Sequence, residues 1–165
     1  MLLFGLLCAA TALAQPMPPT QPVEFTTDLG SAAAEGGKVV LKIRGVIDTA
    51  AGTVGMNVTI HQEQFMGVPA DLPVEAAAPA ARMLSEASDA LLSGQEYSQE
   101  ANGVVVAVAQ GRTAKVVQVK LKNAGFMQTS SFDFDADNAA SVARILERTP
   151  RIVEWLNEKL SAVKR

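Results

Sequence analysis

Apolar and polar residues alternate with a period of two along five segments of the chain. In the first of them, Val23, Phe25 and Leu29 are separated by polar positions. This pattern is typical of antiparallel strands with one face on the core and the other in solvent. A sixth segment, Val104–Ala109, is apolar at every position, which predicts a strand near the centre of a sheet. The alternating segments are residues 23–29, 38–44, 53–61, 115–122 and 126–134.

Three other segments have apolar residues at helical spacing. The first, Ala80–Leu92, forms a single stripe, and its start is open between Pro73 and Pro79. The second covers residues 136–148 and the third residues 151–163. The stripes consist of Ala80, Met83, Leu84, Ala87 and Leu91 in the first helix, Ala139, Val142, Ala143 and Leu146 in the second, and Ile152, Trp155, Leu156, Leu160 and Val163 in the third.

The pair Thr149-Pro150 is expected to break or kink the chain between the last two helices, because proline cannot donate the backbone hydrogen bond that continues a helix. None of these short helices can bury its stripe alone, so each must pack on the dry face of the strands. We therefore predict an α+β fold, with an antiparallel sheet of about six strands and helices on one face.

Two parts of the chain share a pattern of strands followed by a helix, over residues 23–94 and 103–165. Two tandem strands-then-helix repeats are thus a hypothesis, and a chance match of short apolar runs is the alternative. In outline, this order resembles that of single-stranded nucleic-acid binders of the Whirly and Pur type, a resemblance of topology without a family motif. The matching segments are Val39–Ile43 with Val104–Val108, and Ala80–Leu84 with Val142–Leu146.

The chain opens with features of an export signal. The apolar run Leu2–Ala14 is too short to span a bilayer as a helix, and Ala12 and Ala14 have the small side chains that a signal peptidase accepts. No Lys or Arg precedes the run, which would fit a translation start upstream. We expect a signal peptide over residues 1–14, a Pro-rich tether over 15–22 and one α+β domain over 23–165.

The only cysteine, Cys8, lies within the predicted signal. Its preceding residue, Leu7, is larger than lipoprotein processing normally accepts, so we expect Cys8 to be removed with the signal. The mature chain would then lack disulfides although its compartment permits them. This pattern favours a periplasmic or extracellular location, and no later segment has the composition of a transmembrane helix.

Charge is unevenly distributed along the chain. Residues 1–111 carry four basic and eleven acidic side chains, net −7, and residues 112–165 carry ten basic and six acidic, net +4, which together give −3. Basic residues share a strand face in two places, and if those strands are neighbours they form a basic patch for an anionic partner. The alternative is an ordinary solvated sheet face. The residues are Lys38, Lys42 and Arg44 on one strand and Lys120 and Lys122 on another.

Nucleic acid is not the partner that this composition favours. The chain is acidic overall, it carries an export signal, and its strands lack the interleaved aromatic residues that stack bases. An anionic lipid surface, a polyanionic glycan or an acidic protein surface would fit the basic residues better.

Candidate catalytic or metal-binding residues are few. His61 is the only histidine, and because the predicted mature chain offers no cysteine or second histidine to join it, a transition-metal site built on this imidazole would be weak. It is either a surface residue or a general base assisted by Glu63. The run Asp133–Asn138 resembles a calcium loop at its first positions, but Asn138 and Arg144 stand where Gly and Glu are needed, so helix capping is the better interpretation. We expect no metal and no cofactor.

The leading hypothesis is a non-enzymatic exported domain that binds a macromolecule, or itself, through a sheet face or edge. The alternative is a carrier of small apolar ligands with a pocket between sheet and helices. A hydrolase that uses His61 and Glu63 is a weaker alternative. The carrier pocket would be lined by Met56, Phe65, Met66, Phe126, Met127 and Phe132.

Overall fold

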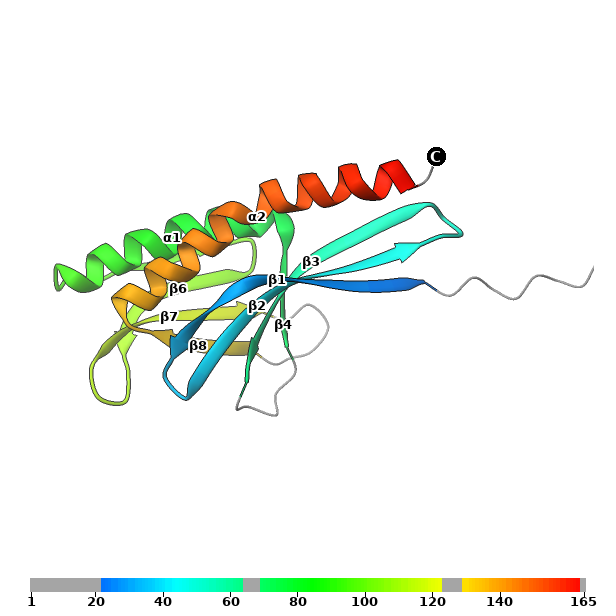
Figure 1. The fold of residues 1–165 in the computed structure, drawn as a ribbon. Helices are drawn as coiled ribbons and strands as arrows, with labels where there is room; N and C mark the ends of the chain where they lie inside the picture. The colour runs from blue at the N-terminus through cyan, green and yellow to red at the C-terminus, as the bar shows by residue number, and fades with distance from the viewer. Residues whose placement is uncertain (1–21, 64–68, 123–128, 164–165) are drawn as a thin grey trace, which may run out of the picture.

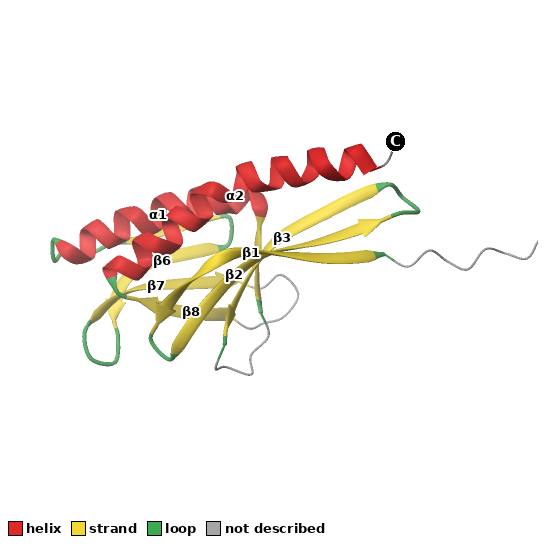
Figure 2. Cartoon of the chain, in the orientation of Figure 1, coloured by secondary structure: helices red, strands yellow, loops and turns green. Residues whose placement is uncertain are grey.

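The computed structural model describes residues 22–63, 69–122 and 129–163, which form eight strands and two helices (Figures 1 and 2). The predicted signal peptide, and all of the tether except Pro22, lie outside these residues. The strands are β1 (Val23–Ala34), β2 (Gly37–Asp48), β3 (Thr53–Gln62), β4 (Ala70–Pro73), β5 (Ser98–Ala101), β6 (Val104–Gln110), β7 (Lys115–Lys122) and β8 (Thr129–Phe134).

The strands form two antiparallel sheets of four strands, each in sequence order. Sheet A has the order β1-β2-β3-β4, and sheet B has the order β5-β6-β7-β8. The α+β class is confirmed, but the prediction of one sheet with about six strands was wrong. The two strands without a sequence signal, β4 and β5, have only four residues each, too few to show a period of two. Alternation also cannot indicate where one sheet ends and the next begins.

Helix α1 spans Val74–Leu92, with Pro73 at its N-cap and Pro79 inside it. Helix α2 spans Ala136–Val163 without interruption, so of the predicted break or kink at Pro150 the break was wrong, and Figure 1 shows that the helix bends along its length. The lost backbone bond at Pro150 is tolerated next to fully buried Thr149, whose hydroxyl donates to the Ile145 carbonyl at 3.2 Å. Neither of these two described helices is long and apolar enough to cross a membrane.

Each helix packs mainly on the sheet of the other half. Helix α1 follows sheet A but lies over β5, β6 and β7, whereas α2 follows sheet B and crosses β1. Figure 1 shows the two helices side by side above the strands. One hydrophobic cluster contains buried residues of both sheets and both helices. The two halves therefore share a single core.

Small side chains bring α1 and α2 close together. The Ser88 hydroxyl in α1 donates to the Ala136 carbonyl at the start of α2, at 2.9 Å, so the face of α1 that carries Ser88 lies against α2. By helical spacing, Ala77 and Ala81 lie on the same face, and both are buried. Because the side chain of alanine is only a methyl group, the backbones of the two helices can approach closely. Larger side chains at these positions would force the helices apart.

The crossing of α2 over β1 requires a glycine. The pairing of β1 with β2 shifts its register between Asp28 and Gly30, which marks a bulge. Gly30 has a φ of 150°, and a Cβ there would lie 2.9 Å from the Cδ1 of Ile145 in α2. A side chain at this position would displace the end of the Ile145 side chain and would require a φ that residues other than glycine rarely adopt.

The turn between β1 and β2 connects the two sheets. The backbone N–H of Glu35 donates to the Asp133 carbonyl in β8 at 2.8 Å. Its carboxylate accepts a bond from the Arg112 backbone N–H at 3.2 Å. Sheet A and sheet B are thus held together at this turn as well as through the helices.

The order of four strands and one helix occurs twice, as β1–β4 with α1 and as β5–β8 with α2. The matched segments occupy equivalent places, since Val39–Ile43 lies in β2 and Val104–Val108 in β6, the second strand of each half. The helices begin at Val74 and Ala136, 62 residues apart (136 − 74). A duplication as the origin of this order stays a hypothesis.

We expect Ala81→Leu to destabilise the fold, because three added carbon atoms must fit between α1 and α2. The free energy of unfolding should fall by about 1–3 kcal/mol in urea denaturation. The control is Ala78→Leu on the exposed side of α1, which should change it by less than about 0.5 kcal/mol. Equal effects of the two variants would contradict a size-limited contact.

Tyr97, the only tyrosine, offers a second test of the packing. Its burial raises its pKa above the ordinary value, and so does the hydrogen bond that its hydroxyl donates to the Glu86 carboxylate at 2.9 Å. The folded protein therefore holds this proton more tightly than the unfolded chain. Its stabilising contribution is complete below about pH 10, the ordinary pKa, and disappears as the pH rises through the raised value.

We expect the phenolate absorbance of the folded protein to appear only well above pH 10, while circular dichroism defines the range over which it stays folded. Glu86→Gln should lower the pKa of Tyr97 because it removes the neighbouring negative charge. An unshifted titration in the unaltered protein would show that the side chain is solvated.

Candidate functional site

The predicted binding residues of the first half lie on the outer face of sheet A. Lys38, Lys42 and Arg44 alternate with the buried residues of β2 and are exposed. His61 lies on β3 opposite Val40 of β2, whose side chain belongs to the same face. The strand pairing therefore brings four predicted residues, Lys38, Lys42, Arg44 and His61, onto one surface.

This surface contains a hollow, which we call the outer-face hollow. It has a volume of about 320 Å³ and is open to solvent. Strand pairing explains its composition, since Thr59 of β3 lies between Lys42 on β2 and Asp71 on β4. The hollow is lined by Thr26, Val40, Lys42, Arg44, Thr59, His61, Pro69 and Asp71. Basic, acidic and hydroxyl groups thus converge within one small volume.

Each basic residue on this face has an acidic partner. The Arg44 guanidinium contacts both carboxylate oxygens of Glu24, at 3.1 and 3.0 Å. The ammonium group of Lys42 lies 3.2 Å from the Asp28 carboxylate. The remaining pair joins Lys38 and Glu63 at 3.5 Å. The face is therefore balanced in charge rather than basic.

The predicted basic patch that joins the two groups of cations was wrong. Its premise was that the strand with Lys42 neighbours the strand with Lys120, but β2 lies in sheet A and β7 in sheet B. Lys120 is exposed opposite Ser131 of β8. Lys122 is the last residue of β7, and its side chain lies outside the described residues.

His61 has no chemical partner within the part of the chain that the structure describes. It makes no hydrogen bond or ion pair there. Glu63, the proposed assistant, instead contacts Lys38. A histidine that acts as a general base is commonly oriented by a second group. This geometry gives the hydrolase hypothesis no support.

The acidic run before α2 caps the helix. The Asp135 carboxylate accepts a hydrogen bond from the Asn138 backbone N–H at 2.8 Å, which satisfies one of the free donors of the first turn. Helix capping is therefore the function of Asp135. Among the described residues, no three His, Cys, Asp or Glu side chains cluster as metal ligands.

The space between helices and sheets is filled. The cavity lined by core residues such as Leu84, Phe132 and Leu146 has a volume of about 10 Å³, less than a small ligand needs. Of the predicted carrier lining, Phe132 is buried and Met56 is half-buried on β3. The remaining four residues, Phe65, Met66, Phe126 and Met127, lie outside the described residues.

Sequence reasoning missed the acidic residues of the outer face, both those beside the hollow and the one that lines it. Glu24 and Asp28 are alternate polar positions of the first strand, so their shared outward face could be read from the sequence. Their contact with Arg44 and Lys42 could not, because it depends on the register of β1 against β2. Asp71 lies on β4, a strand with no sequence signal.

Comparisons with known proteins give little further information. No family model matches the chain, and no curated protein matches it. One solved structure that matches belongs to a study of SsgB, whose mutations correlate with longitudinal cell division during sporulation of Streptomyces coelicolor. It is 13% identical, covers 84% of this chain and 93% of the other, and has a TM-score of 0.33.

We expect the ion pairs of the outer face to contribute little to stability, because both partners of each pair are exposed. Glu24→Gln combined with Asp28→Asn should lower the free energy of unfolding by less than about 1 kcal/mol per pair in urea denaturation. Asp71→Asn is the control, since this exposed carboxylate has no ion pair among the described residues. A loss several times larger would mean that the pairs organise the sheet.

Proposed function

We propose that this protein is an exported, non-enzymatic interaction domain that binds another macromolecule through the outer face of sheet A. The outer-face hollow supports this most directly. It gathers Lys42, Arg44 and His61 beside Asp71, while the cavity among the described core residues has a volume of only about 10 Å³. A function that depends on recognition at the surface fits this arrangement better than one that encloses a small ligand.

The charge balance of the outer face around the hollow favours a protein surface with mixed charges as the partner. A polyanion would meet Glu24 and Asp28 as well as Lys42 and Arg44. Exposed ion pairs are worth only about 0–1 kcal/mol, so a partner can exchange them for its own charges at little cost. Such exchangeable pairs contribute more to specificity and association rate than to affinity.

The export part of the proposal depends on the apolar run Leu2–Ala14 and on a mature chain without cysteine. A protein cleaved after Ala14 would begin at Gln15 and carry its folded domain, from Val23 onward, behind a short Pro-rich segment. The non-enzymatic part depends on His61, which has no orienting partner among the described residues.

Site-specific photo-crosslinking in living cells tests the proposal. A photoreactive residue at Thr26, exposed on the rim of the hollow, should give a discrete crosslinked product with one partner. The same residue at Thr129, exposed on sheet B, should give none and is the matched control. The mass of the uncrosslinked protein from the export compartment should correspond to a chain that begins at Gln15.

Charge reversal provides the second arm of this experiment. Lys42→Glu with Arg44→Glu places like charges beside Asp28 and Glu24, and we expect the crosslink at Thr26 to disappear. The circular dichroism spectrum should stay unchanged, because all four side chains are exposed. Equal crosslinking at Thr26 and Thr129, or full persistence in the reversed variant, would refute this face as the binding surface.

A further inference from the structure

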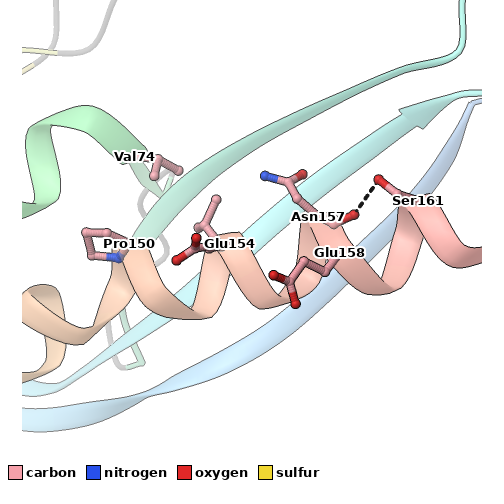
Figure 3. Close-up of a pocket in the computed structure, with 7 residues that line it drawn as sticks. Val74, Pro150, Glu154, Asn157, Glu158 and Ser161 are labelled. Atoms are coloured by element: carbon pink, nitrogen blue, oxygen red, sulfur yellow. Dashed lines mark hydrogen bonds between the residues drawn. The ribbon is translucent and has the colours of Figure 1, made fainter.

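A second surface lies along the C-terminal half of α2. A groove of about 840 Å³ runs there, within the size range of ligand-binding clefts. Figure 3 shows its α2 residues in a row along the helix, with Val74 near the Pro150 end. The groove is lined by Val74, Pro150, Val153, Glu154, Asn157, Glu158 and Ser161.

This groove starts where β4 ends beside β3. Pro73, the last residue of β4, is paired with Asn57, and the next residue, Val74, lines the groove. Strand β3 extends four residues beyond this pair, over Thr53–Met56, and none of the described strands pairs with it on that side. Figure 1 shows the β2–β3 turn and the end of α2 projecting in the same direction. The free edge of β3 therefore begins next to the Val74 end of the groove.

The length of the groove fits a short added strand. Its α2 residues extend from Pro150 to Ser161, and eleven helical steps of 1.5 Å give about 16 Å. An extended chain covers about 3.3 Å per residue, so about five residues span this length. Backbone groups on the free edge of β3 can hydrogen-bond such a segment, as in other cases of β-strand addition.

The charged residues that line the groove indicate the composition of a segment that could bind there. Glu154 and Glu158 are four residues apart on one face of α2, an arrangement of like charges that weakens a helix. Neither carboxylate has an ion pair or side-chain hydrogen bond among the described residues. Lys or Arg side chains from a bound segment would neutralise both. Val74 and Val153 also line the groove and can contact apolar side chains of the segment.

We propose that this groove binds an extended segment of a partner protein, rich in Lys or Arg alternating with apolar residues, as an added strand beside β3. A second copy of this chain fits poorly, because pairing of two β3 edges would bring Glu154 and Glu158 of both copies together. The chain's own apolar leader fits poorly as well, since residues 2–14 contain no Lys or Arg. This site is separate from the outer-face hollow.

The test uses a fluorescent seven-residue peptide of alternating valine and lysine and the protein purified from the compartment in which it accumulates. We expect saturable binding by fluorescence anisotropy that weakens as salt is raised. A peptide of alternating valine and glutamate should not bind. Hydrogen exchange should slow at Thr53–Met56 when the lysine peptide binds, and it should not change over residues 23–28 of β1, which lie at the opposite edge of sheet A.

Two double variants distinguish peptide binding in the groove from a general electrostatic attraction to the protein. Glu154→Gln with Glu158→Gln should weaken peptide binding about three- to thirty-fold, the effect of losing two exposed charge pairs. Asp89→Asn with Glu96→Gln removes the same net charge at the opposite end of α1 and should leave binding unchanged. All four residues are exposed, so these variants should unfold at the same urea concentration as the unaltered protein.

Equal weakening by both double variants, or protection confined to another strand, would overturn the proposal. Lack of saturable binding by the lysine peptide would overturn it too. If Lys42→Glu with Arg44→Glu abolished peptide binding while the groove variant did not, the peptide would occupy the outer-face hollow instead. That result would leave the proposed function standing and reject the groove.

Discussion

The close contact between α1 and α2 is the constraint on which the rest of the fold depends. Each sheet is covered mainly by the helix of the other half, because α1 lies chiefly on sheet B and α2 crosses sheet A. The two sheets can share a core only while the helices stay close, which the alanines of α1 and the Ser88 hydrogen bond permit. Gly30 allows the matching approach of α2 to β1.

This arrangement leaves two exposed surfaces, for which we propose recognition, and little space among the described core residues. The buried faces of both sheets are covered by the helix pair, so the outer face of sheet A stays accessible with its paired charges. Helix α2, with 28 residues, is longer than α1, with 19. Its C-terminal half therefore extends beyond α1 and forms the acidic groove next to the free end of β3.

Long strands and helices could be predicted from the sequence, whereas very short strands could not. The alternation in β1, β2, β3 and β7 and the stripes in both helices extend over enough residues to show a period. β4 and β5 are too short for that. The expected break at Pro150 failed for a different reason. The helix continues through the proline, and the part before it is held in the core by the buried residues Val142, Leu146 and Thr149.

The sequence by itself determined the α+β class, the wet and dry faces of the long strands, and the outward position of Lys38, Lys42, Arg44 and His61, because a period of two assigns faces within one strand. It could not decide which strands are neighbours. Only the tertiary structure paired Arg44 with Glu24 and Lys42 with Asp28 and placed Lys120 in the other sheet. Strand order and register come from contacts between distant segments, which a local pattern does not encode.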